Sequence, residues 1–169
     1  MSSKQIFFAL WPDNRQRDRL RDVINSVAKT VEGKVVDRRN WHVTLAFVGQ
    51  YPVSEIPVLQ ERAAQIEVEP FRLGFDRLEF WARGKVACLI APTIPPELQA
   101  LVSSLNDVLL EIGVTPHDRT YRPHITVARN ARSFVTERLA QRATTEWSGF
   151  ELMESISAPG SLTYSPLKQ

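Results

Sequence analysis

The sequence predicts an α+β fold in which two similar lobes share a cleft. Apolar runs typical of strands alternate with amphipathic helical segments, and some strand pairs are joined by tight turns while others are joined by helices. The order of elements in the second half is much like that in the first. No Gly/Ser-rich linker, charge block or low-complexity tract divides the chain. We therefore expect a single domain over residues 1–169, with two lobes that depend on each other.

Six elements are expected in the first half: strands at residues 5–10, 41–48, 71–81 and 85–91, and helices at 13–31 and 54–66. Asp13 is the predicted N-cap of the first helix, because Gln16 follows three residues later in capping-box position. Gly33 is expected to stop this helix, and Gly49 to end the strand at 41–48. Pro57 must lie in the first turn of the second helix.

The second half is expected to contain helices at 95–112 and 133–142, and strands at 123–128, 150–156 and 162–164. Pro96 opens the longer helix, whose apolar residues recur at helical spacing until Gly113. Pro159 and Gly160 form the turn between the last two strands.

The composition argues against several classes of protein. Cys88 is the only cysteine, which excludes an internal disulfide and a cysteine-based zinc cluster. No glycine-rich nucleotide motif is present, the apolar runs are too short for a transmembrane helix, and the N-terminus is unlike a signal peptide. The net charge of +2 does not favour a long nucleic-acid track. We expect a cytoplasmic protein that does not associate with membranes.

Two segments share the pattern His-aliphatic-Thr-aliphatic-Ala: His42–Ala46 and His124–Ala128. They lie about half a chain length apart, one in each predicted lobe. Residues i and i+2 of a strand point to one face about 6.5 Å apart, so each His and Thr should share a face with the small Ala, which leaves room for a ligand. The aliphatic residues should face the core, and by the same parity Phe47 is expected to pack there.

Two histidines across a cleft suit acid–base chemistry near neutral pH, because a neutral imidazole accepts a proton and a protonated one donates it. Threonine hydroxyls can donate hydrogen bonds to anionic oxygens. The combination favours attack of water on a phosphodiester. His117 fits neither copy of the pattern and is interpreted as a loop residue; paired with His124, it lacks the spacing of metal ligands.

The segments NWHVTLAFVG and RPHITVARNA, together with the opening IFFAL and the terminal LTYSPLK, resemble the two-histidine (2H) phosphoesterases in the expected order. Within that superfamily they are most similar to the LigT-like RNA 2′,3′-cyclic phosphodiesterases, historically called 2′–5′ RNA ligases. The resemblance implies a bilobal 2H phosphoesterase fold with two pseudo-symmetric lobes of mainly antiparallel sheet, helices outside and a cleft between. Each lobe would contribute one His-x-Thr strand, at 42–44 and 124–126.

The resemblance also implies hydrolysis of 2′,3′-cyclic phosphates on RNA ends or nucleotides to 2′-phosphomonoesters, without metal or other cofactor. It implies that His42 is the general acid and His124 the general base, and that Thr44, Thr126 and Arg129 bind the phosphate. On strict alternation Arg129 lies on the core-facing side, so the strand must end or bulge before it. We expect a monomer with no obligate protein partner.

Two alternatives stay open at this stage. The same site could act on another cyclic phosphodiester or on a 2′–5′ linkage, including reversible ligation, or the chain could bind RNA ends without catalysis.

Arg119, Arg122 and Arg129 are candidates for a positive lip against RNA phosphates, with scattered surface arginines as the alternative. Three aromatic residues are candidates for stacking a base: Phe47, Trp81 and Tyr121.

Overall fold

The computed structural model describes residues 1–117 and 120–168, so Arg119 lies outside the described residues. The elements in chain order are β1 (Ser3–Leu10), α1 (Asn14–Ala28), β2 (Lys34–Val35), the 3-10 turn η1 (Arg38–Asn40), β3 (Val43–Pro52), the 3-10 turn η2 (Val53–Glu55), α2 (Ile56–Ala64), β4 (Phe71–Trp81), β5 (Val86–Ile90), α3 (Pro96–Glu111), β6 (His124–Arg129), β7 (Glu137–Trp147), β8 (Glu151–Ala158) and β9 (Ser161–Pro166). The α+β class is confirmed.

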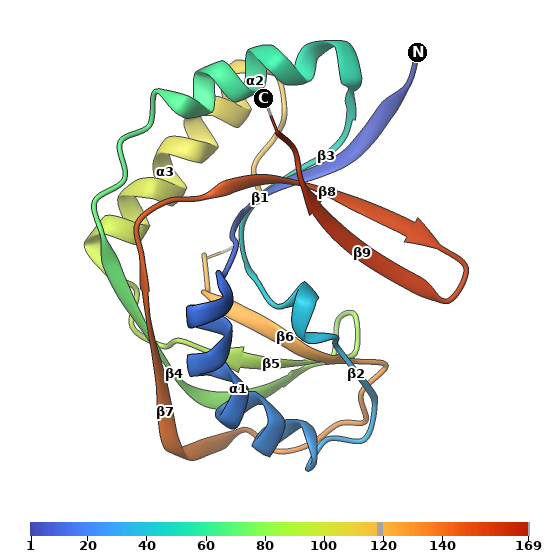
Figure 1. Cartoon of the computed structure of the whole chain (residues 1–169), viewed down its shortest axis with the longest axis vertical. Coiled ribbons are helices and arrows are strands. Elements are labelled where there is room, and N and C mark those ends of the chain that lie inside the picture. The colour runs from blue at the N-terminus through green and yellow to red at the C-terminus, as the bar shows by residue number, and fades with distance from the viewer. Residues whose placement is uncertain (118–119, 169) are drawn as a thin grey trace.

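The strands form two antiparallel sheets, which are visible in Figure 1. The first sheet has the order β3-β1-β8-β9, and the second has the order β2-β6-β5-β4-β7. α3 packs on β3 and α2 packs on α3, whereas α1 crosses over to pack on β7 and β6 of the second sheet. One predicted His-x-Thr segment therefore belongs to each sheet, on β3 and on β6.

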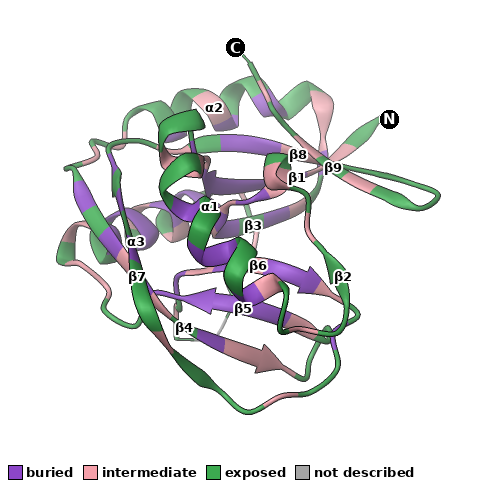
Figure 2. Cartoon of the chain, turned by 60° about the horizontal axis from the view of Figure 1, so that its bottom comes forward, coloured by how far each residue is buried: buried purple, intermediate pink, exposed green. Residues whose placement is uncertain are grey.

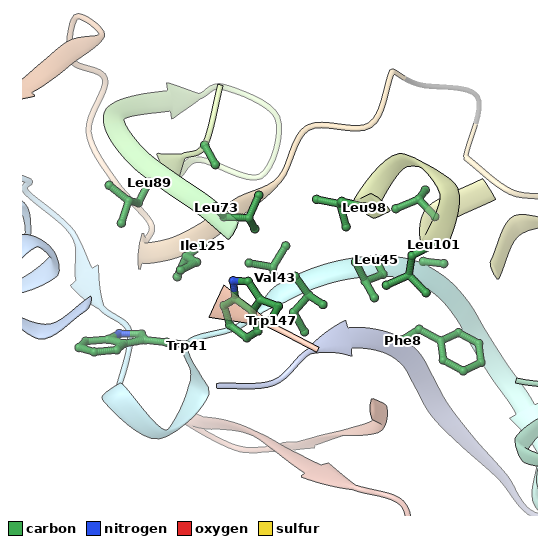
Figure 3. Close-up of a cluster of buried hydrophobic side chains, with 14 of the residues drawn as sticks. Phe8, Trp41, Val43, Leu45, Leu73, Leu89, Leu98, Leu101, Ile125 and Trp147 are labelled. Atoms are coloured by element: carbon green, nitrogen blue, oxygen red, sulfur yellow. The ribbon is translucent and has the colours of Figure 1, made fainter. Parts of the chain in front are cut away.

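One hydrophobic cluster joins the two sheets. Figure 2 shows buried residues along β1, β3, β5 and β6, and exposed residues on the outer side of α1. Val43 and Ile125, the middle residues of the two His-x-Thr segments, are fully buried and lie in this cluster near Trp147 (Figure 3). Because both middle residues face the same core, each neighbouring His and Thr points away from it.

The first helix begins as expected and ends early. The capping box is present: the Asp13 carboxylate accepts a hydrogen bond from the Gln16 backbone N–H at 2.8 Å, and the Gln16 side chain accepts from the Asp13 N–H at 2.7 Å. The helix ends at Ala28 and not near residue 31, because the backbone N–H and the hydroxyl of Thr30 both donate to the Val27 carbonyl. Those bonds close a turn in place of another helical residue.

The prediction of a helix at 133–142 is wrong. Residues 137–147 form β7, which pairs with β4 at the edge of the second sheet. Side chains alternate there, with Ala143, Thr145 and Trp147 buried, and the Trp147 indole N–H donates to the Thr145 hydroxyl at 2.8 Å. The stretch ERLAQR is rich in helix-forming residues, and pairing with β4 overrides that local preference.

A β-bulge directly follows the threonine of each His-x-Thr segment. In the β1–β3 pair, Phe8 lies opposite Ala46 and Ala9 opposite Thr44, so Leu45 is the extra residue. In the β5–β6 pair, Ala87 lies opposite Ala128 and Cys88 opposite Thr126, so Val127 is the extra residue. A bulge reverses the alternation of the residues that follow it.

The bulges correct two expectations based on strict alternation. Ala46 and Ala128 do not share a face with His and Thr; both are buried in the core. Phe47 was expected in the core and is instead 48% exposed, with its ring 6.0 Å from that of Phe7. The side of the two strands that carries the His and Thr side chains is called the His-Thr face. The two alanines leave this face for the core, and Phe47 joins it.

Within the described part of the chain, no helix combines the length and apolar character needed to cross a membrane.

Candidate active site

His42 lies directly between the turn η1 and strand β3, and both of its ring nitrogens are engaged. Nδ1 is 2.8 Å from the Asn40 carbonyl oxygen, and Nε2 is 3.1 Å from the Thr44 hydroxyl. A carbonyl can only accept, so Nδ1 carries the hydrogen and donates it. In the neutral ring, Nε2 then has the lone pair and accepts from Thr44.

Aromatic rings enclose the His42 imidazole. Its centroid is 4.8 Å from the Tyr164 ring, 5.2 Å from Phe7 and 5.9 Å from Trp11. Burial lowers the pKa of His42 to about 4, and the positive charge of Arg129, with that of His124 when it is protonated, acts in the same direction, against the raising effect of the Asn40 hydrogen bond. In the free protein His42 is therefore neutral at pH 7.

His124 begins β6 in a matching arrangement. Its Nδ1–H donates to the Arg122 carbonyl at 2.8 Å, which again leaves Nε2 as the atom with the lone pair. The Trp81 ring lies against it with a centroid distance of 4.3 Å. Burial lowers the pKa of His124, and the charge of Arg122 adds to that effect, while the bond to the Arg122 carbonyl opposes it.

Arg129 reaches the His-Thr face because of the bulge at Val127. Its guanidinium donates from Nη2 to the Tyr164 hydroxyl at 2.9 Å, and the Tyr164 ring meets His42 edge to face. Arg129 belongs to the second sheet and Tyr164 to the first, so this bond links the two sheets. The bulge anticipated as a requirement for Arg129 is present.

The structure places the five predicted site residues at two strands that contact each other, two of them at β3 and three on β6. The Tyr121 hydroxyl donates to the Thr44 carbonyl at 2.9 Å and so ties the segment before β6 to β3. Thr126 lies on β6 opposite the buried Cys88 of β5. β3 and β6 lie against each other, which brings the two His-x-Thr segments close.

Of the other described residues proposed from the sequence for stacking a base or binding RNA phosphates, one is exposed and the others are held by contacts within the protein. Phe47 is open to solvent and lies at right angles to the His117 ring, 5.7 Å away. Tyr121 is held by its bond to Thr44, Trp81 packs on His124, and Arg122 forms an ion pair with Glu79. Arg122 is therefore not a free cation for a positive lip.

Sequence reasoning missed Tyr164, Trp11 and Phe7 as neighbours of His42. Phe7 lies on β1, Trp11 directly follows that strand and Tyr164 lies on β9. The pairing of β1 with β3 and with β8, and of β8 with β9, brings them to one place. Tyr164 lies within the LTYSPLK segment that supports the family resemblance, but no spacing in the sequence connects it with His42.

Two surface pockets of about 710 Å³ each lie elsewhere, one beside α2 and the C-terminal segment and one beside the start of α1. Neither is lined by a histidine. Among residues 1–117 and 120–168, no three His, Cys, Asp or Glu side chains are arranged to hold a metal ion. The candidate site itself holds two imidazoles, those of His42 and His124, beside the hydroxyls of Thr44 and Thr126 and the guanidinium of Arg129.

A family model described as the 2′-5′ RNA ligase superfamily matches residues 12–153. The Escherichia coli (strain K12) protein named RNA 2′,3′-cyclic phosphodiesterase is 31% identical over 141 residues, which cover 81% of this chain and 78% of that protein. The protein of the same name from Archaeoglobus fulgidus is 24% identical, and the match covers 97% of this chain and 98% of that protein.

Solved structures are also similar to this chain. The crystal structure of E. coli LigT complexed with 3′-AMP is similar with a TM-score of 0.87 and 27% identity, over 99% of this chain and 97% of that chain. A Thermus thermophilus protein, 23% identical over 97% of this chain and 95% of its own, has a similar fold with a TM-score of 0.76.

Proposed function

The chain belongs to the 2′-5′ RNA ligase superfamily, and from this membership we propose that it hydrolyses 2′,3′-cyclic phosphates on RNA ends or nucleotides to 2′-phosphomonoesters. The family resemblance expected from the sequence is confirmed. The observation that carries the proposal is the matched state of His42 and His124, because each donates from Nδ1 to a backbone carbonyl and keeps Nε2 for proton transfer.

The proposed reaction needs one base and one acid. Nε2 of His124 takes a proton from water while the water oxygen forms a bond to phosphorus. The bond from phosphorus to O3′ breaks, and the protonated Nε2 of His42 gives its proton to that oxygen. The products are a 2′-phosphomonoester and a free 3′-hydroxyl, with one proton gained by His124 and one lost by His42.

Phosphate binding is assigned to Thr44, Thr126 and Arg129. The hydroxyls can donate to the non-bridging oxygens, and the guanidinium can add a charge-assisted hydrogen bond. No metal or other cofactor takes part in this proposal. Every proposed group comes from one chain, so we infer that a monomer suffices, with the substrate held between two lobes that correspond to the two sheets. A cytoplasmic location, in keeping with the single cysteine, is part of the same proposal.

The proposed acid must become protonated when substrate binds. A bound anion would neutralise Arg129 and add negative charge beside His42, and both changes raise the pKa of His42 from about 4 toward neutrality. Sulfate, which stays a dianion near neutral pH, is expected to raise this pKa. Because binding then takes up a proton, sulfate should bind more tightly as the pH falls.

Titration of the histidine ring protons by NMR, with and without sulfate, measures this effect. His117 serves as the internal reference because it lies outside the group of proposed ligands. If sulfate raised only the pKa of His124, the acid and base assignments would be exchanged. An unchanged titration of both His42 and His124 would contradict an anion site between them.

The proposed function is tested by incubating the EDTA-treated protein with an oligonucleotide that ends in a 2′,3′-cyclic phosphate. We expect conversion to the 2′-phosphomonoester, identified by comparison with synthetic 2′- and 3′-phosphate standards. A 3′-phosphate product would reject the proposed leaving group. Binding without turnover would favour an RNA-end binding protein, and a strict requirement for added metal would overturn the metal-free mechanism.

A further inference from the structure

Glu79 on β4 holds two side chains next to the second histidine. Its carboxylate accepts two hydrogen bonds from the Arg122 guanidinium, at 3.0 and 2.7 Å, and a third from the Trp81 indole N–H at 3.1 Å. The guanidinium also lies over the Trp81 ring, 5.4 Å from a ring centroid. We call Glu79, Trp81 and Arg122 the Glu79 clamp.

The clamp differs from an ordinary surface ion pair. The Glu79 side chain is only 16% exposed, and its contact with Arg122 is the two-pronged kind that fixes geometry. Hydrogen bonds from Arg122, and then from Trp81, keep the pKa of Glu79 below its usual range despite burial. Glu79 is therefore a carboxylate at neutral pH and can hold both partners at once.

Both partners of Glu79 contact His124. The Trp81 ring packs on the imidazole at 4.3 Å, and the backbone carbonyl of Arg122 accepts the Nδ1 hydrogen at 2.8 Å. That carbonyl decides which nitrogen carries the hydrogen. If it moved away, the Nε2–H form of the neutral ring would be populated, and this form has no lone pair for a base at Nε2.

The first histidine has a corresponding support. The residue two positions before His42 is Asn40, whose carbonyl accepts from His42 Nδ1 at 2.8 Å. The Asn40 side-chain amide donates to the Leu162 carbonyl on β9 at 2.9 Å. In each copy, therefore, the residue that orients the imidazole with its carbonyl is itself anchored by its side chain. Asn40, beside His42, is anchored by a hydrogen bond between neutral groups, whereas Arg122, beside His124, is anchored by an ion pair.

We propose that Glu79 and Arg122 are positioning residues that hold His124 in the Nδ1–H form, with its ring against Trp81 and Nε2 available to take a proton. The catalytic part of this inference rests on the proposed function. The positioning part concerns the imidazole alone and can be measured without substrate.

The test compares E79A with N40A. Only three histidines are present, so the ring nitrogens of each can be followed by 15N NMR, which distinguishes the two neutral forms. We expect E79A to move His124 from the Nδ1–H form toward a mixture and to leave His42 unchanged. N40A should do the opposite. E79Q keeps an acceptor for Trp81 and loses the charge that holds Arg122, so its effect should be intermediate.

For hydrolysis, E79A is expected to lower kcat about tenfold with less than about a twofold change in KM, since the imidazole is misplaced while the phosphate ligands remain. The matched control is E32Q, which weakens the exposed Glu32–Arg132 ion pair, 3.1 Å long; among the described residues neither side chain forms a hydrogen bond or ion pair with His42, His124 or Glu79. E32Q should change neither kcat nor the histidine spectra.

Two results would overturn the positioning role. One is an unchanged His124 spectrum in E79A. The other is an equal change in His42 and His124, which would mean a general loss of structure; far-UV circular dichroism and urea unfolding check that possibility. If wild type did not hydrolyse cyclic phosphates, the proposed function would fail while the spectra would still decide the positioning role.

Discussion

Replacing His42 or His124 by alanine is expected to lower kcat by about 10²- to 10⁴-fold, the usual contribution of a general acid or base. Each Nε2 is assigned one proton transfer, and the other histidine of the site is already assigned the opposite transfer. Steady-state rates on a cyclic-phosphate-terminated oligonucleotide measure the loss. The double variant should be only slightly slower than the worse single variant, because groups that act in one step are not additive.

The third histidine provides the control for this experiment. His117 contacts the Phe47 ring and has no assigned proton transfer, so His117→Ala should keep kcat within about threefold of wild type. Full activity in either His42→Ala or His124→Ala would reject the two-histidine mechanism. Folding of each variant is checked by its far-UV circular dichroism spectrum.

Replacing Arg129 by methionine is the second large effect that we expect. Removing one preorganised donor to a reacting oxyanion costs about 10²- to 10³-fold in rate, and kcat/KM should fall by about this factor. Tyr164→Phe removes only the hydroxyl that accepts from Arg129 at 2.9 Å, so it should give a smaller loss in the same direction. Sulfate affinity should fall in both variants.

Arg138→Met is the matched control for Arg129. Arg138 is exposed on β7, and its replacement removes the same charge without touching the proposed site. If Arg129→Met and Arg138→Met changed kcat/KM and sulfate affinity equally, the effect would be one of net charge, and Arg129 would not be a phosphate ligand.

Local sequence signals predicted the elements that depend on neighbouring residues. The capping box at Asp13 and Gln16 is present, and the helix expected at 95–112 is α3, over Pro96–Glu111. These signals suffice because a helix satisfies its hydrogen bonds within its own segment. Residues 133–142 show where the same reasoning fails, since the stability of a strand comes from its partner and β7 owes its conformation to β4.

The sequence alone predicted the family to which this protein belongs and supplied the chemistry that we propose for it, through two His-x-Thr segments and the five residues proposed for catalysis and phosphate binding. The tertiary structure alone decided which side chains join them. Extra residues at Leu45 and Val127 turn Phe47 and Arg129 outward and send two alanines into the core. Strand pairing brings Tyr164 to His42, and Glu79 to the segment before His124. The physical reason is that a motif is a local pattern, whereas bulges and contacts depend on the register between strands distant in the sequence.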